Sequence, residues 1–200
     1  MTSALPNLLT VLRLIGVPVV VVALLVDGGA DGSWRWVAFW VFVAASVTDY
    51  LDGYLARRWQ VVSNFGKLAD PIADKALVLG ALACLIVVDG LPWWPVAIIA
   101  FREIYVTVGR LLVASDVVIA ASPGGKVKTV LQLVSVSLYL FPPAPGWMLV
   151  LAWVLLLGAT AVAVVSGVDY GMKIAKARRE HPPQPGEHRV PKPEAGGFPQ

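Results

Sequence analysis

The chain has 200 residues, of which 58% are hydrophobic and 14% charged, and its mean hydropathy is +0.73. Soluble domains contain about 25% charged residues, so this composition excludes an ordinary soluble enzyme and indicates several membrane spans. The single cysteine, Cys84, excludes an internal disulfide and a zinc module built on thiolates. The net charge of +3 comes from basic residues beside apolar segments, a pattern typical of membrane topology rather than nucleic-acid binding.

The apolar stretches predict an all-α integral membrane protein with six transmembrane helices. A helix of about 20 residues crosses the hydrocarbon core of a bilayer. Stretches of this kind occur at residues 5–26, 34–56, 68–88, 93–115, 127–142 and 147–170. We divide the chain into a membrane domain at residues 1–176 and a disordered, proline-rich cytoplasmic tail at residues 177–200, which has too few large apolar residues to order itself.

Lysine and arginine are unevenly distributed among the connections between these stretches. The first, third and fifth connections have none, whereas the second and fourth carry Arg57, Arg58, Lys67, Lys126 and Lys128. By the positive-inside rule, this distribution places both termini in the cytoplasm. Arg35 is the exception near the outer ends, and we expect it to extend to the membrane interface beside two tryptophans.

Four aspartates gather where the second stretch ends and the third begins. Asp49 and Asp52 are spaced i and i+3, and Asp70 and Asp74 are spaced i and i+4, so each pair shares a helix face. Two antiparallel helices joined by a short loop can direct all four carboxylates to one point. Because four like charges repel, the arrangement predicts hard divalent cations between them.

Small residues and an arginine accompany these aspartates. Gly53, Ala56 and Gly66 keep bulky side chains away from the cluster, and Arg57 suits a phosphate or pyrophosphate ligand through forked hydrogen bonds. The alternative is that the aspartates form structural ion pairs with nearby basic residues, Lys75 among them. Intramembrane carboxylates are costly and usually functional, which favours the metal site.

The motif DxxDGxxAR, followed after eight residues by GxxxDxxxD, spans Asp49 to Asp74 without a mismatch and resembles the signature of the CDP-alcohol phosphatidyltransferase family. The segment PNLLTVLR near the amino terminus resembles bacterial members that use glycerol 3-phosphate. The resemblance implies transfer of the phosphatidyl group from CDP-diacylglycerol to glycerol 3-phosphate with release of CMP. It also implies two Mg²⁺ or Mn²⁺ ions, a homodimer among membrane lipids, and a bacterial plasma membrane with the active site facing the cytoplasm.

The resemblance assigns roles to individual residues. Asp49, Asp52 and Asp70 would be metal ligands, and Asp74 would be the general base while also touching the second metal ion. The residues that would bind the CDP moiety are Asp52, Gly53, Ala56, Arg57, Gly66, Asn7 and Thr10. Together with Arg13, Asn7 and Thr10 either close the cytidine side of the site or anchor an interfacial helix, and their spacing favours neither.

Basic residues on the fourth and fifth stretches predict a site for an anionic acceptor. They are Arg102, Arg110, Lys126 and Lys128. Arg102 lies too deep to be a topology signal, so it either lines a polar cavity or pairs with an acid. Glu103 and Arg110 are seven residues apart and share a helix face, which predicts a network of charges within that helix or across a cavity. The two lysines have a second reading as an ordinary positive-inside loop.

Other functions remain open. The same chemistry with inositol phosphate, or with phosphatidylglycerol to give cardiolipin, would use the same aspartates. A divalent-cation transporter would also explain the carboxylates, although it would leave Gly53, Arg57 and Gly66 unexplained and would place its site near the middle of the membrane.

Overall fold

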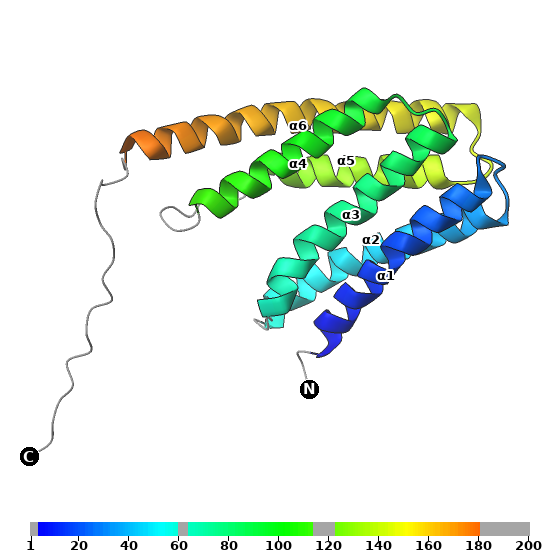
Figure 1. Ribbon diagram of the computed structural model, residues 1–200, viewed down its shortest axis with the longest axis horizontal. Helices are drawn as coiled ribbons and strands as arrows, with labels where there is room; N and C mark the ends of the chain where they lie inside the picture. Colours follow the sequence, from blue (N-terminus) through cyan, green and yellow to red (C-terminus); the bar gives the residue numbers. More distant parts are fainter. Residues whose placement is uncertain (1–3, 60–63, 114–122, 181–200) are drawn as a thin grey trace, which may run out of the picture.

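The computed structural model describes residues 4–59, 64–113 and 123–180, with side chains described for residues 12–48, 75–109, 125–173 and 175. This part of the chain contains six α-helices and no strand (Figure 1). The helices are α1 (Ala4–Asp27), α2 (Ser33–Trp59), α3 (Asn64–Val88), α4 (Trp93–Val113), α5 (Pro123–Leu140) and α6 (Gly146–Glu180). The prediction of six helices is confirmed, and each helix contains most or all of one predicted apolar stretch.

Membrane-length apolar character is concentrated in α6. Among the residues with described side chains, Gly146–Lys173 is long and apolar enough to cross a membrane, with a mean hydropathy of 2.6. A shorter apolar stretch, Lys75–Val88, lies in α3. Helix α6 continues to Glu180 and so includes the first four residues of the expected tail, while residues 181–200 lie outside the described part of the chain.

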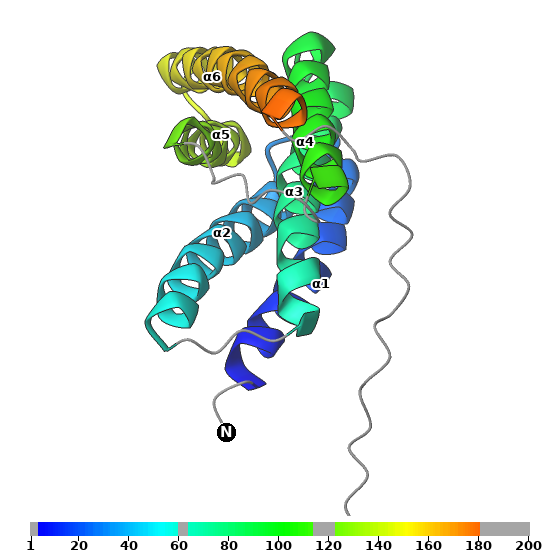
Figure 2. The same cartoon turned by 90° about the vertical axis from the view of Figure 1, so that its left-hand side faces the viewer.

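The helices form two packed groups. Helix α1 packs against α2 and α3, and α6 packs against α5 and α4. Figure 2 shows α5 and α6 side by side, with α2 below α5, and α2 contacts both α1 and α5. The connections that lack lysine and arginine lie together at the right-hand end of Figure 1. The first residue of α1 and the last residue of α6 lie away from that end of the molecule. This alternation agrees with termini on one side.

The core joins both groups of helices. Its largest fully buried side chains include Leu24 of α1, Phe42 of α2, Leu82 of α3 and Ile99 of α4. Close approach of α1 and α3 depends on Gly80, where an added Cβ would lie 3.3 Å from a Val21 methyl group. Cys84 is 6% exposed within this core, as expected of a small packing residue.

The expectation for Arg35 is wrong. Its side chain is 4% exposed and does not extend to an interface. The guanidinium donates through Nη1 and Nη2 to the two carboxylate oxygens of Asp89, and Nη2 also donates to the Tyr139 carbonyl at 2.8 Å. A planar guanidinium favours such forked pairing with a carboxylate over solvation beside the tryptophans. Arg35 therefore connects the start of α2 to the α3–α4 connection and the end of α5.

Candidate active site and the basic cluster beside it

The helical backbone places the predicted aspartates near a single connection. Asp49 and Asp52 lie within the last three turns of α2, and Asp70 and Asp74 lie within the first three turns of α3. Residues 60–63 alone join these helices, so the two helix ends are separated by at most about 18 Å. Each pair keeps the spacing that puts both residues on one helix face.

The side chains of this motif lie outside the described ones. This applies to the four aspartates and also to Gly53, Ala56, Arg57 and Gly66. Among the described side chains, no group of three or more histidines, cysteines, aspartates or glutamates could hold a metal ion. The metal site at the four aspartates therefore remains a prediction. Its donor set fits hard divalent cations, because four carboxylates come from two helices that meet at one connection.

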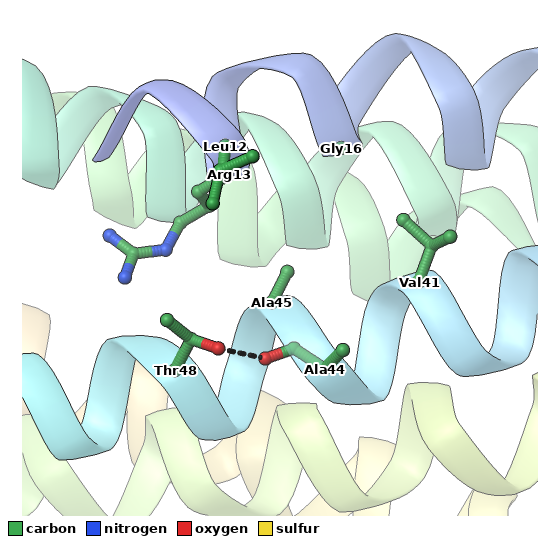
Figure 3. Close-up of a pocket in the computed structure, with 7 residues that line it drawn as sticks. All are labelled: Leu12, Arg13, Gly16, Val41, Ala44, Ala45 and Thr48. Carbon is green, nitrogen blue, oxygen red and sulfur yellow. Dashed lines mark hydrogen bonds between the residues drawn. The ribbon is translucent and has the colours of Figure 1, made fainter. Parts of the chain in front are cut away.

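A cavity of about 230 Å³ lies between α1 and α2 and ends beside the motif (Figure 3). It is lined by Leu12, Arg13, Gly16, Val41, Ala44, Ala45 and Thr48. Arg13 is 3% exposed, and its guanidinium lies on the Thr48 side of the cavity. Thr48 directly precedes Asp49 and donates to the Ala44 carbonyl at 2.6 Å. The burial of Arg13 favours a role beside the motif over an interfacial anchor; the side chains of Asn7 and Thr10 lie outside the described ones.

Glu103 of α4 joins basic residues from three helices. Its Oε1 accepts from Arg102 Nη1 at 3.0 Å and from Lys128 Nζ of α5. Its Oε2 lies 3.6 Å from Lys75 Nζ of α3, which also donates to Thr107 Oγ1. The side chains of Glu103 and Arg102 are each 11% exposed, and that of Lys128 is 5% exposed. We call Lys75, Arg102, Glu103 and Lys128 the basic cluster.

The basic cluster carries three positive charges and one negative charge, so its formal charge is +2. Buried charge of one sign is costly unless it is compensated, and it attracts an anionic ligand. Lys75 follows Asp74 directly along α3, which places the cluster beside the last aspartate of the motif. The arrangement can therefore attract a phosphate next to the turn of α3 that carries the last aspartate of the motif.

The structure brings together only some of the predicted acceptor residues. Arg102 and Lys128 meet on Glu103, whereas Lys126 is exposed to solvent and takes no part in the described cluster. The side chain of Arg110 lies outside the described ones. Sequence reasoning considered Lys75 only as a partner for the aspartates, and the described contacts of Lys75 go to α4. Its position immediately after the motif was the signal that could have identified it.

Comparison with known proteins gives consistent matches. The family model described as CDP-alcohol phosphatidyltransferase matches residues 3–164. A probable phosphatidylglycerophosphate synthase of Mycobacterium tuberculosis is 44% identical over 176 residues, covering 88% of this chain and 82% of that protein. A CDP-diacylglycerol–glycerol-3-phosphate 3-phosphatidyltransferase of Bacillus subtilis is 41% identical over 140 residues, covering 66% of this chain and 70% of that protein. A protein of the same name from Rickettsia felis is 31% identical, covering 83% and 92%.

Proposed function

The chain belongs to the CDP-alcohol phosphatidyltransferase family, and we propose that it transfers the phosphatidyl group of CDP-diacylglycerol to glycerol 3-phosphate. The products are phosphatidylglycerophosphate and CMP. The observation that favours a phosphorylated acceptor is the basic cluster, because two of its cations are buried and its excess positive charge suits an acceptor that brings its own phosphate. The name of the Bacillus subtilis relative specifies glycerol 3-phosphate, which favours this acceptor over inositol phosphate.

The four aspartates divide into metal ligands and a base. Asp49, Asp52 and Asp70 would hold two Mg²⁺ or Mn²⁺ ions, with Asp74 also touching the second. When bound, such ions neutralise the pyrophosphate and the charge that develops on the departing phosphate. Arg57 would hold the nucleotide side through forked hydrogen bonds, while Gly53, Ala56 and Gly66 leave room for the CDP moiety. Asn7 and Thr10 of α1 would close the same side.

Asp74 moves the proton in the reaction. Its carboxylate takes the proton from the free primary hydroxyl of glycerol 3-phosphate as that oxygen attacks the β-phosphorus of CDP-diacylglycerol. A new phosphorus–oxygen bond forms, the bond to the bridging oxygen of the pyrophosphate breaks, and CMP leaves with the electron pair. No covalent intermediate with the protein is needed.

The basic cluster binds the phosphate of the acceptor in this proposal. Arg102 and Lys128 supply buried charge from α4 and α5, and Lys75 adds a third cation from α3. Lys126 and Arg110 would contribute from the same end of α5 and α4. Binding of the phosphate of glycerol 3-phosphate then orients its free primary hydroxyl towards Asp74. Groups of a substrate that do not react can assist the reaction in this way, because their binding energy positions the group that does.

We also propose that all six helices cross the plasma membrane, with both termini and the active site on the cytoplasmic side. Several apolar side chains on α3, α4 and α6 are largely exposed, among them Val87, Phe101 and Val165 at 70–76%. Exposed apolar surface of this kind suits contact with lipid. Helices α1 to α5 would cross as part of the bundle, because Arg13, Glu103 and Lys128 are buried between helices rather than exposed to lipid.

The decisive experiment measures CMP release from CDP-diacylglycerol by the purified protein in detergent with Mg²⁺. Parallel reactions would contain glycerol 3-phosphate, inositol phosphate, phosphatidylglycerol or no acceptor. Release with glycerol 3-phosphate alone is expected. Release with another acceptor would keep the aspartate chemistry and overturn the acceptor, whereas Mg²⁺ uptake into vesicles without CMP release would favour a transporter.

A further inference from the structure

Helix α6 carries a buried phenol, that of Tyr170. Tyr170 is 7% exposed, and its Oη has no hydrogen-bond partner within the described part of the chain. Buried hydroxyl groups are nearly always hydrogen-bonded, because burial removes the water that would otherwise satisfy them. A ligand that occupies the site during the reaction would provide the missing partner.

Arg102 of α4 carries a second donor of this kind. Arg102 Nε is buried and, like Tyr170 Oη, has no hydrogen-bond partner among the described residues. Arg102 packs against α6 at Gly167, where an added Cβ would lie 3.4 Å from Arg102 Cγ. Gly167 precedes Tyr170 by three residues, so both face α4.

The packing of α4 on α6 repeats one turn further along. Tyr105, three residues after Arg102, has its ring edge-on to that of Tyr170 with centroids 6.4 Å apart. An added Cβ at Gly171 would lie 2.8 Å from Tyr105 Oη. Because side chains on a helix lean towards its amino terminus, the ring of Tyr170 leans back over the turn that contains Gly167. The missing side chain at Gly167 leaves that space to Arg102, on the face of α6 that also carries Tyr170.

We infer that Tyr170 Oη and Arg102 Nε donate hydrogen bonds to the phosphate of the acceptor. This inference rests on the proposed function and adds Tyr170 as a residue that determines acceptor specificity. The ligand must be rich in acceptors, because the neighbouring cations can only donate and Glu103 already accepts from Arg102 and Lys128. A phosphate has several acceptor oxygens and complements the net positive charge of the basic cluster.

Tyr170→Phe tests the inference, because it removes only the hydroxyl. The KM for glycerol 3-phosphate should rise about tenfold, as expected for one lost hydrogen bond to a charged group, while kcat and the KM for CDP-diacylglycerol stay within about twofold. Tyr105→Phe is the matched control, since it removes the phenol of the partner ring, which is 40% exposed, and should leave all three constants unchanged. Equal constants for Tyr170→Phe and the wild type would overturn the inference.

Propane-1,3-diol phosphate, which lacks the secondary hydroxyl of glycerol, identifies the bound group. If Tyr170 binds the phosphate, Tyr170→Phe raises the KM for this analogue by the same factor as for glycerol 3-phosphate. If the KM for the analogue does not change, Tyr170 binds the hydroxyl instead and the phosphate assignment is wrong.

Calorimetric binding of glycerol 3-phosphate separates failure of this inference from failure of the proposed function. Absence of CMP release by the wild type would refute the proposed acceptor, whereas the ratio of binding constants between wild type and Tyr170→Phe does not depend on turnover.

Arg102→Lys keeps the charge and removes Nε. If both donors contact one phosphate, the effects of Arg102→Lys and Tyr170→Phe should combine non-additively. Unchanged binding by both variants, or no detectable binding by any form, would overturn the inference.

Discussion

Asp74 is the residue whose substitution should separate chemistry from metal binding. Asp74→Asn keeps the shape of the side chain and removes its basicity, so CMP release should fall about 10²–10⁴-fold. Binding of Mg²⁺ and CDP-diacylglycerol should be partly kept, because Asp49, Asp52 and Asp70 still supply ligands. Asp49→Asn is the comparison and should lose binding as well as turnover. Normal turnover by purified Asp74→Asn would show that the base is another group.

Glu103 compensates the cations around it, so Glu103→Gln should destabilise the protein by about 3–5 kcal/mol. The amide keeps the volume but leaves the charges of Lys75, Arg102 and Lys128 without their common anion. Glycerol 3-phosphate should raise the Tm of the variant more than that of the wild type, since its phosphate replaces the lost charge. Thermal unfolding in detergent with and without the ligand measures both effects, and equal Tm values without ligand would contradict the compensating role.

At the scale of elements, the ion pair between Arg35 and Asp89 fixes three helices at the end opposite the aspartates. Asp89→Asn removes the charge partner of Arg35, whose side chain is 4% exposed, and should lower the free energy of unfolding by about 2–3 kcal/mol. Loss of one partner from a fully buried ion pair costs about 3–5 kcal/mol, and the smaller effect is expected here because Asp89 is 24% exposed. The rate of CMP release per folded molecule should not change. Lys173→Ala is the control, since its partner Asp169 and Lys173 itself are 41% and 51% exposed, and its effect should stay within about 0.5 kcal/mol.

The elements were predictable from sequence because apolar runs and charged connections alternate along the chain. Those runs gave the positions of all six helices, and the motif gave the ends of α2 and α3 at which its aspartates lie. Contacts between helices were not predictable from one sequence. Nothing local indicates that Arg35 pairs with Asp89, 54 residues away, or that Lys75 and Lys128 meet on Glu103. The sequence analysis did not identify Tyr170, because only its burial without a hydrogen-bond partner among the described residues distinguishes it.

At the scale of the whole molecule, topology can be tested through cysteines, because Cys84 is the only native one and is buried. A membrane-impermeant maleimide should therefore not label the wild type. Ala30→Cys lies in the exposed α1–α2 connection and should be labelled in intact cells if that end faces outward. Lys173→Cys lies near the exposed end of α6 and should be labelled only after the membrane is opened.

The labelling pattern decides between six spans and fewer. If α6 alone crossed the membrane, its two ends would still lie on opposite sides of the membrane. The α1–α2 connection, which contains residue 30, would then not need to lie on the same side as the α5–α6 connection. Figure 1 places both connections at the same end of the bundle, so Ala144→Cys in the second should label together with Ala30→Cys. Labelling of Ala144→Cys without Ala30→Cys in intact cells would show that α1 and α2 do not span. The aspartates at the far ends of α2 and α3 would then need another way to reach a substrate held in the bilayer.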